Sequence, residues 1–527
     1  MHKVLISDNV ARECVDILQA VDGVEVDFNT NLSPEELKSI IGEYDALVVR
    51  SATKVYEDVI DVAKKLKVIG RAGAGVDNID VSKATDAGIV VMNTPGGNTV
   101  STAEHAFSLI MALSRNIAQA DRSMKDGEWG RKKYVGVEVR GKTLGIIGLG
   151  NIGRSLAQRA SAFEMKVLGV DPFISKKMAQ RYSIELTTLD EIWGKSDYIS
   201  VHTPLNNSTR HLINSGTLAK CKDGVRIINC ARGGIVNEED LLAAIESGKV
   251  AGAALDVYEK EPPDKNSVVM SDKILCTPHL GASTTEAQDI VAAMIAEQLR
   301  DYFLTGEVRN AVNMPSLVPE VFEKIKPYIR LCKNMGAMLG QLCTGQLSSI
   351  DITYYGEVHH FDTWTITSSA LEGVFTRGYA EGVNLLNAAS TAEKLGIKVN
   401  EIKSSEEKDY KNCIEMSITT DKGAINALGT IFGKNDQRIM RLYDYELDFV
   451  PEGNVLICGN KDLPGIIGNI GTVLGKKGIN IAHMTWARKS PAGEAIVVLN
   501  TDDVLDNKTR DEVLAITGIE WAVFLVL

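Results

Sequence analysis

The sequence predicts an α/β protein with two doubly wound parallel-sheet domains, followed by an α+β domain and a small ferredoxin-like βαββαβ domain. Two series of short apolar runs, separated by helical patterns, predict the parallel sheets, because strands buried on both faces are apolar along their length. The order of runs and helical patterns after Asn454 predicts the last domain. A chain of 527 residues has room for about three to five domains.

The first series predicts a doubly wound, flavodoxin-like domain. Its strands are expected at residues 4–6, 46–49, 68–69 and 89–92, its helix at residues 10–21, and a further helix follows this series at residues 101–119. Ser101-Thr102-Ala103-Glu104 has the spacing of a capping box, so we expect the second helix to begin there.

The second series predicts strands at residues 144–147, 166–170, 198–201, 226–229, 252–255 and 274–276. A long helical pattern follows at residues 285–304, and its natural partner is the first sheet. We therefore predict that the second domain, residues 98–284, is inserted into the first, residues 1–97 and 285–313. The two chain crossings, near Gly97 and Thr285, would form a hinge.

Two further domains are predicted at residues 316–450 and 453–527. In the former, period-two alternation at residues 349–354 predicts a half-buried strand, and residues 379–395 look helical. In the latter, strands are expected at residues 455–458, 480–484, 495–499 and 523–527, with helices after the turn at 462–465 and at 508–516.

Composition and charge exclude several classes of protein. The 57 Lys and Arg residues are outnumbered by 69 Asp and Glu, and no basic face for nucleic acid is visible. No apolar run reaches the length of about 18 residues that spans a membrane, and the N-terminal run is too short for a signal peptide. The 8 cysteines are scattered without a C-x-x-C pair. We expect a reduced cytoplasmic protein that binds no nucleic acid, membrane or metal.

A glycine motif after the first strand of the second series predicts a dinucleotide site. Gly148, Gly150 and Gly153 stand between a strand and a helix, and Asp171 ends the next strand. Such glycines let the backbone approach a pyrophosphate at a helix N-terminus, and the acid can bind ribose hydroxyls. Because a 2′-phosphate would meet the charge of Asp171, NAD is favoured over NADP. The competing interpretation is a tight strand–helix turn beside an incidental acid.

Three side chains that carry chemistry follow three successive strands of the second series. Arg232 lies in Cys230-Ala231-Arg232-Gly233-Gly234, Glu261 in the segment after Asp256, and His279 in Pro278-His279-Leu280-Gly281-Ala282. A guanidinium at a strand end can bind a carboxylate, and a carboxylate beside a histidine suits general acid–base work. The alternatives are a surface arginine and a structural histidine.

These motifs together resemble the D-2-hydroxyacid dehydrogenase family over about residues 1–313. The resemblance implies a Rossmann-type NAD domain with catalytic Arg232, Glu261 and His279. It implies that the cofactor is bound by Gly148, Gly150, Asn151, Ile152, Gly153, Asp171, Thr203, Cys230, Ala231, Asp256, Gly281 and Ala282.

The full length resembles the long members of this family, which oxidise 3-phospho-D-glycerate and carry an intervening domain and a C-terminal ACT domain. Substrate contacts would then come from Arg50, Ser51, Arg71, Gly73, Ala74, Gly75, Asn98 and Arg131. Ala74 stands where relatives often have threonine. Arg131 would reach a neighbouring subunit's site, unless it belongs to a solvated basic loop.

The resemblance also implies regulation. In ACT domains the turn before the first helix and the start of the second strand bind an amino acid between two copies, which here points to Asp462 and Asn480 with L-serine as effector. The competing interpretation is a helix cap and a turn residue. A homodimer or homotetramer is expected. Two alternative functions are another 2-hydroxyacid specificity, such as glycerate or 2-hydroxyglutarate, and a non-catalytic sensor of NAD or amino acids.

Overall fold

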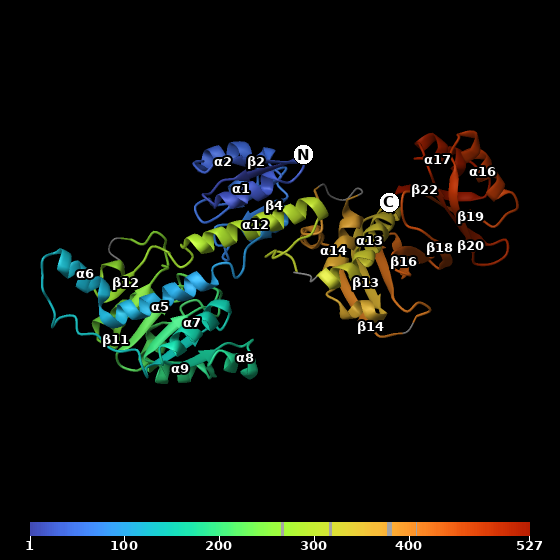
Figure 1. The fold of residues 1–527 in the computed structure, drawn as a ribbon. Helices are drawn as coiled ribbons and strands as arrows, with labels where there is room; N and C mark the ends of the chain where they lie inside the picture. The colour runs from blue at the N-terminus through green and yellow to red at the C-terminus, as the bar shows by residue number, and fades with distance from the viewer. Residues whose placement is uncertain (265–267, 316–318, 377–381, 407) are drawn as a thin grey trace.

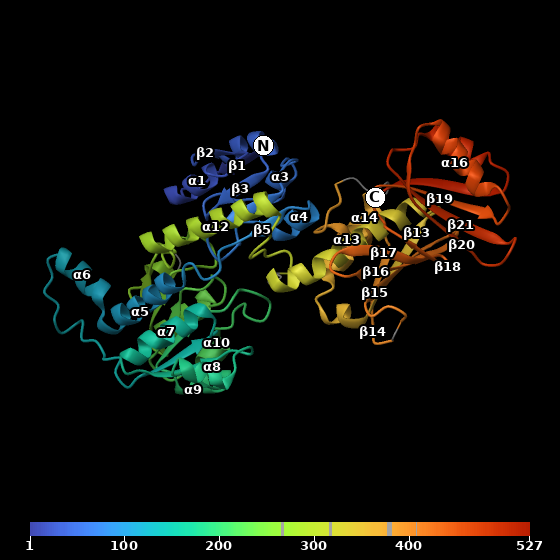
Figure 2. The ribbon, with the colours of Figure 1, turned by 45° about the vertical axis from the view of Figure 1, so that its right-hand side comes forward.

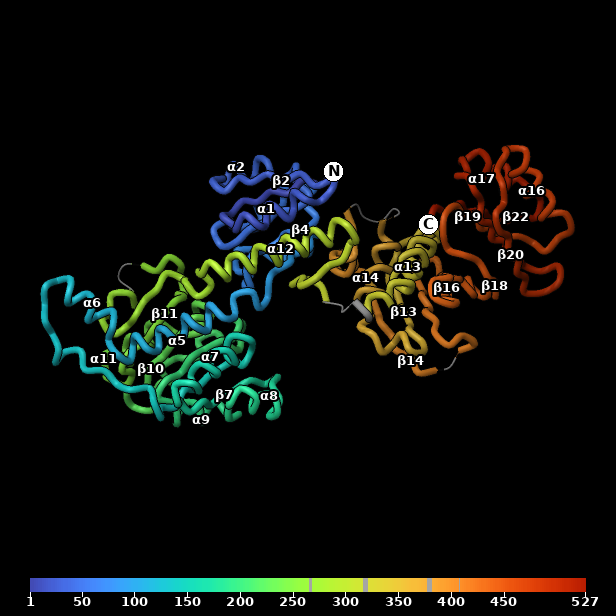
Figure 3. The backbone as a smooth tube through the Cα atoms, viewed as in Figure 1, coloured from blue at the N-terminus to red at the C-terminus, as the bar shows by residue number. Residues whose placement is uncertain are grey.

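The computed structural model describes residues 1–264, 268–315, 319–376, 382–406 and 408–527. Four sheets follow one another along an elongated molecule, with the first two at one end and the last two at the other (Figure 1; Figure 2). The chain leaves the first sheet, builds the second, and returns to the first before it enters the C-terminal half (Figure 3). The predicted fold class is confirmed.

The first sheet is parallel, with the strand order β2-β1-β3-β4-β5. Its elements are β1 His2–Ile6, α1 Arg12–Gln19, β2 Val24–Phe28, α2 Pro34–Ile40, η1 Ile41–Glu43, β3 Ala46–Val49, α3 Glu57–Ile60, β4 Val68–Arg71, α4 Val81–Asp86 and β5 Val90–Met92. The returning helix α12, Thr285–Thr305, packs beside α1 and over β4. A Cβ atom at Gly70 would lie 2.8 Å from the Ile295 side chain, so this contact is close.

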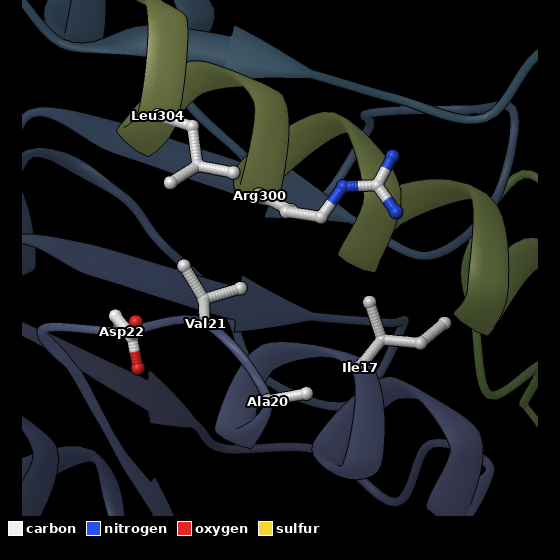
Figure 4. A pocket seen from close by; sticks show the side chains of 6 residues that line it. All are labelled: Ile17, Ala20, Val21, Asp22, Arg300 and Leu304. Carbon is white, nitrogen blue, oxygen red and sulfur yellow. The ribbon is translucent and has the colours of Figure 1, made fainter.

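Between α1 and α12 lies a shallow surface pocket of about 420 Å³ (Figure 4). Its lining is mostly aliphatic, with Asp22 at one end and Arg300 on α12. The Arg300 guanidinium binds the carboxylate of the adjacent Asp301 at 2.8 Å. The pocket is therefore a groove between two packed helices, on the α1 side of the first sheet.

The second sheet is also parallel, with the order β12-β11-β10-β9-β6-β7-β8. Its strands are β6 Thr143–Ile147, β7 Lys166–Val170, β8 Glu185–Leu186, β9 Tyr198–Val201, β10 Val225–Asn229, β11 Val250–Leu255 and β12 Ile274–Cys276. Its helices are α5 Thr99–Arg115, α6 Ile117–Lys125, α7 Asn151–Ala162, α8 Lys176–Arg181, α9 Leu189–Lys195, α10 Ser215–Lys220, α11 Glu238–Glu246 and η2 Val268–Met270. Strand order reverses beside β6, and ligands of such sheets bind at the carboxyl ends of the strands there.

The helix expected at residues 101–119 differs from the one observed. Helix α5 already begins at Thr99 and ends at Arg115, where Asn116 takes a left-handed conformation with φ 53° before α6. Ser101 lies inside α5, and its hydroxyl donates to the carbonyl of Gly281 at 2.8 Å. The capping-box prediction is therefore wrong, because this serine bonds across the fold and not to its own helix.

The third sheet is mixed, with the order β14-β13-β15-β16-β17-β18. Its elements are α13 Pro319–Leu342, β13 Leu347–Tyr355, η3 Gly356–His360, α14 Trp364–Phe375, α15 Ala388–Lys394, β14 Lys398–Ser404, β15 Cys413–Thr420, β16 Gly423–Phe432, β17 Asp436–Leu442 and β18 Tyr445–Phe449. The helix predicted at 379–395 is limited to α15. Residues 377–381 lie outside the described residues, and the Asn387 side chain accepts from the Asn384 N–H in a turn before α15.

The fourth sheet has the predicted βαββαβ connectivity and the order β20-β21-β19-β22. Its elements are β19 Asn454–Lys461, α16 Ile466–Lys476, β20 Ile481–Arg488, β21 Glu494–Thr501, α17 Asn507–Leu514 and β22 Ile519–Val526. Helices α16 and α17 cover one face. The other face contributes Val455, Ile457, Ile496, Val498 and Leu525 to the core of the third sheet, so the last two domains share one core.

Candidate active site

The three glycines of the loop between β6 and α7 differ in how closely neighbouring backbone atoms approach them. Gly148 has φ 94°, and a Cβ there would lie 2.5 Å from the carbonyl oxygen of His202. A Cβ at Gly153 would lie 2.1 Å from the Gly148 carbonyl oxygen, whereas Gly150 faces open space. Gly150 caps α7 without a side-chain hydrogen bond, so the first amides of α7 stay available for an anion.

Asp171 follows β7 and lies against this loop. Its Oδ2 accepts from the Leu149 N–H at 2.8 Å, and its Oδ1 accepts from the Phe173 N–H at 2.8 Å. The carboxylate is therefore held at the carboxyl end of the sheet, beside the first turn of α7 with Asn151 and Ile152. The geometry suits a ribose beside a pyrophosphate.

Two further residues predicted to contact the cofactor line the neighbouring strand ends. The Thr203 hydroxyl, just after β9, is buried and finds no hydrogen-bond partner among the described residues. Cys230 follows β10 and is buried, and burial raises the pKa of its thiol. An unpartnered buried hydroxyl fits a site that a polar ligand completes.

His279 and Glu261 form the predicted pair. Nδ1 of His279 lies 2.9 Å from Oε2 of Glu261, and His279 has a left-handed backbone with φ 55°. The hydrogen bond to Glu261 raises the pKa of His279 against the opposing effect of burial. Burial acts to raise the pKa of Glu261, but the hydrogen bond and the charge of His279, together with the Tyr258 N–H, outweigh it, and the pKa lies below its ordinary value.

Asp256 shapes the loop that carries His279. Its buried carboxylate accepts from the N–H groups of Leu280 at 2.7 Å and Gly281 at 2.8 Å, and from the Thr277 hydroxyl at 2.6 Å. His105 on α5 places Nε2 3.2 Å from the same carboxylate. Asp256 is thus engaged by the protein itself, and its direct contact with a cofactor, like that of Ala282, stays a prediction.

Three arginines, Arg50, Arg71 and Arg232, lie close together where the two parallel-sheet domains meet. The Arg71 Nε donates to the carbonyl of Arg50 at 3.1 Å, and burial, followed by the charge of Arg232, lowers the pKa of Arg71 to about 10. A Cβ at Gly73 would lie 2.0 Å from Nη1 of Arg71, and one at Gly75 would lie 1.9 Å from Nη2 of Arg232. Glycine is therefore required at both positions for these side chains to lie where they do.

Two aspartates around these arginines were not predicted from the sequence. Asp8 accepts from the N–H groups of Arg50 at 2.6 Å and Thr53 at 3.0 Å, which fixes the loop after β3. Asp77 places Oδ2 2.9 Å from Nε of Arg232. Their partners lie far away in the sequence, so no local pattern marks them.

The remaining predicted substrate residues lie in different parts of the first two domains. Ser51 and Ala74 lie in the loops after β3 and β4, and the Ala74 carbonyl accepts from the Asn93 side chain at 2.6 Å. Asn98 occupies the N-cap position of α5 without a capping hydrogen bond. Arg131 is exposed in the segment after α6, which lies on the side of the second domain away from the first sheet (Figure 1).

Both predicted effector residues have partners within the chain. The Asp462 carboxylate binds Nη1 of Arg488 at 2.7 Å and accepts from the Ala492 N–H, and the bond to Arg488 keeps its pKa below the ordinary value. Asn480 donates to the Asp502 carboxylate at 2.8 Å. An amino acid that binds to either residue must share or replace these contacts.

Metal and membrane signals are both lacking in the part of the chain that the structure describes. His, Cys, Asp and Glu side chains there do not gather in groups of three or more that could hold a metal ion. Within the same residues, every helix is too short or too polar to cross a membrane.

Three family models match successive parts of the chain. Residues 107–281 match the D-isomer specific 2-hydroxyacid dehydrogenase NAD binding domain, residues 324–443 the D-3-phosphoglycerate dehydrogenase intervening domain, and residues 454–518 the ACT domain. The NAD-binding domain that the sequence predicts is therefore present.

Similar proteins extend the match to the full length. The chain is 42% identical to a D-3-phosphoglycerate dehydrogenase of Synechocystis, over 98% of this chain and 94% of that one. It is 43% identical to one of Archaeoglobus fulgidus over 100% of both. A crystal structure of a glyoxylate reductase from Paecilomyes thermophila, 32% identical, covers 61% of this chain and 99% of its own with a TM-score of 0.54. The chain therefore belongs to the D-3-phosphoglycerate dehydrogenase family, within the D-2-hydroxyacid dehydrogenases.

Proposed function

We propose that the protein oxidises 3-phospho-D-glycerate to 3-phosphohydroxypyruvate with NAD, the first step of L-serine biosynthesis. The observation that carries the proposal is that Arg232, which lies near both the His279–Glu261 pair and Arg71, contacts the first domain through Asp77. The substrate needs those groups: a base for its hydroxyl, a cation for its carboxylate and a second cationic site for its phosphate.

NAD would lie along the carboxyl ends of the second sheet. The amides at the start of α7 would hold the pyrophosphate, Asp171 the ribose, and the unpartnered Thr203 hydroxyl would gain a polar partner. When bound there, NAD supplies the acceptor for the hydride that leaves the substrate carbon.

His279 acts as the base. Because its Nδ1 binds Glu261, its Nε2 is left to take the proton of the substrate hydroxyl. The imidazolium that forms is stabilised by the Glu261 carboxylate, which is also what raises the pKa of His279. Asp256 holds the N–H groups of the next two residues and so fixes the direction in which His279 points.

Arg232 binds the substrate carboxylate, and Arg71 with Arg50 receives the phosphate. Arg71 is partly buried, and a guanidinium shielded from water attracts an anion more strongly than a fully exposed one. Ser51, Gly73, Ala74 and Gly75 would border the same anion through their loops. A substrate without a second anionic group would leave Arg71 unused, which disfavours glycerate.

The fourth sheet would bind an amino-acid effector between two copies, and L-serine is the candidate because it is the end product of the implied route. Asp462 would receive the ammonium group and Asn480 the carboxylate or hydroxyl. The protein would then act in the cytoplasm as a homodimer or homotetramer, with Arg131 near a neighbouring subunit's site.

A steady-state panel tests the proposal. The purified protein is given NAD with 3-phospho-D-glycerate, D-glycerate or D-2-hydroxyglutarate, and reduced nicotinamide is followed by absorbance. We expect kcat/KM to be highest for the phosphorylated substrate, and His279→Ala as control to lose activity with all three. A preference for D-2-hydroxyglutarate would refute the substrate, and inactivity with every 2-hydroxy acid would favour a sensor.

A further inference from the structure

An ion pair joins the two parallel-sheet domains at the candidate active site. Arg232 follows β10 in the second domain, and Asp77 lies between β4 and α4 in the first. Nε of Arg232 is 2.9 Å from Oδ2 of Asp77. Arg232, to which the proposed function assigns the substrate carboxylate, thus pairs with a carboxylate of the other domain.

The contacts of Arg232 define which part of its guanidinium is left for a ligand. Asp77 forms an ion pair with Nε, and Nη1 donates to the carbonyl of Ala231 at 2.7 Å. Nη2 lies against Gly75, where a Cβ would come within 1.9 Å. Among the described residues, one N–H of Nη1 and both of Nη2 have no hydrogen-bond partner, and the terminal edge that these two nitrogens share suits a carboxylate.

We propose that Asp77 is a positioning residue for Arg232: it holds Nε so that the two terminal nitrogens face the substrate carboxylate. This inference rests on the proposed function, in which Arg232 binds that carboxylate. In the opposite role, the Asp77 carboxylate would occupy the place of the substrate carboxylate on Arg232 and would be displaced when the substrate binds. The positioning role agrees better with the contacts, because the two terminal nitrogens can donate to a carboxylate while Asp77 stays paired with Nε.

Asp77 contributes little to the stability of its domain. Its side chain is 68% exposed, and exposed ion pairs add little to the stability of a fold. Asp8 differs, since its carboxylate accepts several backbone N–H groups of one loop. Replacing Asp77 should therefore alter Arg232 without unfolding the first domain.

The test compares Asp77→Ala and Asp77→Asn with the unmodified full-length protein. We expect Asp77→Ala to lower kcat/KM for 3-phospho-D-glycerate by about 10- to 10²-fold, the effect of a displaced binding group, with a raised KM for that substrate. The KM for NAD, the acid limb of the pH profile and the thermal midpoint should not move. Asp77→Asn should recover little of the loss, because the contact with Nε is an ion pair and the amide carries no charge.

Two further variants sharpen the result. Asp61→Ala removes another exposed carboxylate of the first domain, one that binds Lys83 at 2.8 Å, and should leave kcat/KM unchanged. In an Arg232→Ala background, Asp77→Ala should cause no further loss, because a residue that acts through another adds nothing once that one is gone.

Three results would overturn the inference but not the proposed function. They are a lowered KM in Asp77→Ala, which is the sign that Asp77 stands in for the substrate, kinetics equal to those of the unmodified protein, and an additive loss in the Arg232→Ala background. Inactivity of the unmodified protein toward every 2-hydroxy acid would instead refute the proposed function, and this inference with it.

Discussion

Replacing Asp171 should weaken the preference for NAD over NADP. The carboxylate is held by two backbone N–H groups at 2.8 Å, from Leu149 and Phe173, so it cannot turn away from a ligand without losing both. A 2′-phosphate about 4 Å away would be repelled by about 1–4 kcal/mol per pair of unit charges, for an effective dielectric constant between about 80 and 20. At about 1.4 kcal/mol per tenfold change, NAD should be preferred by about 5- to 10³-fold.

The assay is the ratio of kcat/KM for NAD to that for NADP, measured with saturating 3-phospho-D-glycerate. We expect Asp171→Ala to reduce this ratio by most of that factor, mainly through a lower kcat/KM with NAD and relief of repulsion with NADP. Asp190→Ala removes an exposed carboxylate that binds Lys220 at 3.0 Å on the same domain, and it should leave the ratio unchanged. Equal use of both cofactors by the unmodified protein would refute the reasoning.

Three other predictions concern the base, the core and the effector. Glu261→Gln should move the acid limb of the pH–rate profile to lower pH: the carboxylate raises the pKa of His279, the base must be deprotonated to act, and without the charge that pKa falls. Gly373→Ala should destabilise the third domain by about 1–3 kcal/mol in denaturant titration, since its Cβ would lie 2.1 Å from a carbonyl oxygen of α13, whereas Gly475→Ala meets nothing within 4 Å. Asp462→Ala should abolish inhibition by L-serine in the activity assay and leave uninhibited turnover unchanged.

Each of these has a contrary outcome. If the acid limb of the pH–rate profile does not move in Glu261→Gln, the Glu261 carboxylate does not set the pKa of His279. Equal stabilities of the two glycine variants would mean that α13 and α14 do not need their close approach. If L-serine inhibits Asp462→Ala as strongly as the unmodified protein, the effector binds at a site that does not include Asp462.

The central strands and the candidate residues that follow them could be predicted because the signals are local. Buried parallel strands are continuous apolar runs, and Arg232, Glu261 and His279 stand just after three of them. β2 was missed because it lies at the edge of its sheet and is only partly buried, with alternating polar residues. β8 was missed because it has two residues.

Long-range contacts account for what the sequence did not predict at the site. Asp8, Asp77 and His105 act on loops or strand ends that lie far from them in the chain. Their own neighbourhoods show only an acid after a strand, an acid in a glycine-rich loop and a histidine in a helix. The capping-box prediction fails for the same reason, since Ser101 bonds to Gly281 and not to its own helix.

The shared core of the last two domains decides how regulation can be tested. Val455, Ile457, Ile496, Val498 and Leu525 are fully buried and pack on the third sheet and α13. Fully burying such a side chain contributes about 1.5–3 kcal/mol, so deleting residues 453–527 would uncover an apolar face of the third domain. That domain in turn binds the first one, where Asn384 donates to the Gly88 carbonyl at 2.7 Å and Lys394 binds Asp86 at 2.7 Å. A truncation would therefore disturb the first domain as well as the proposed effector residues, and point variants such as Asp462→Ala are the changes that can separate the two.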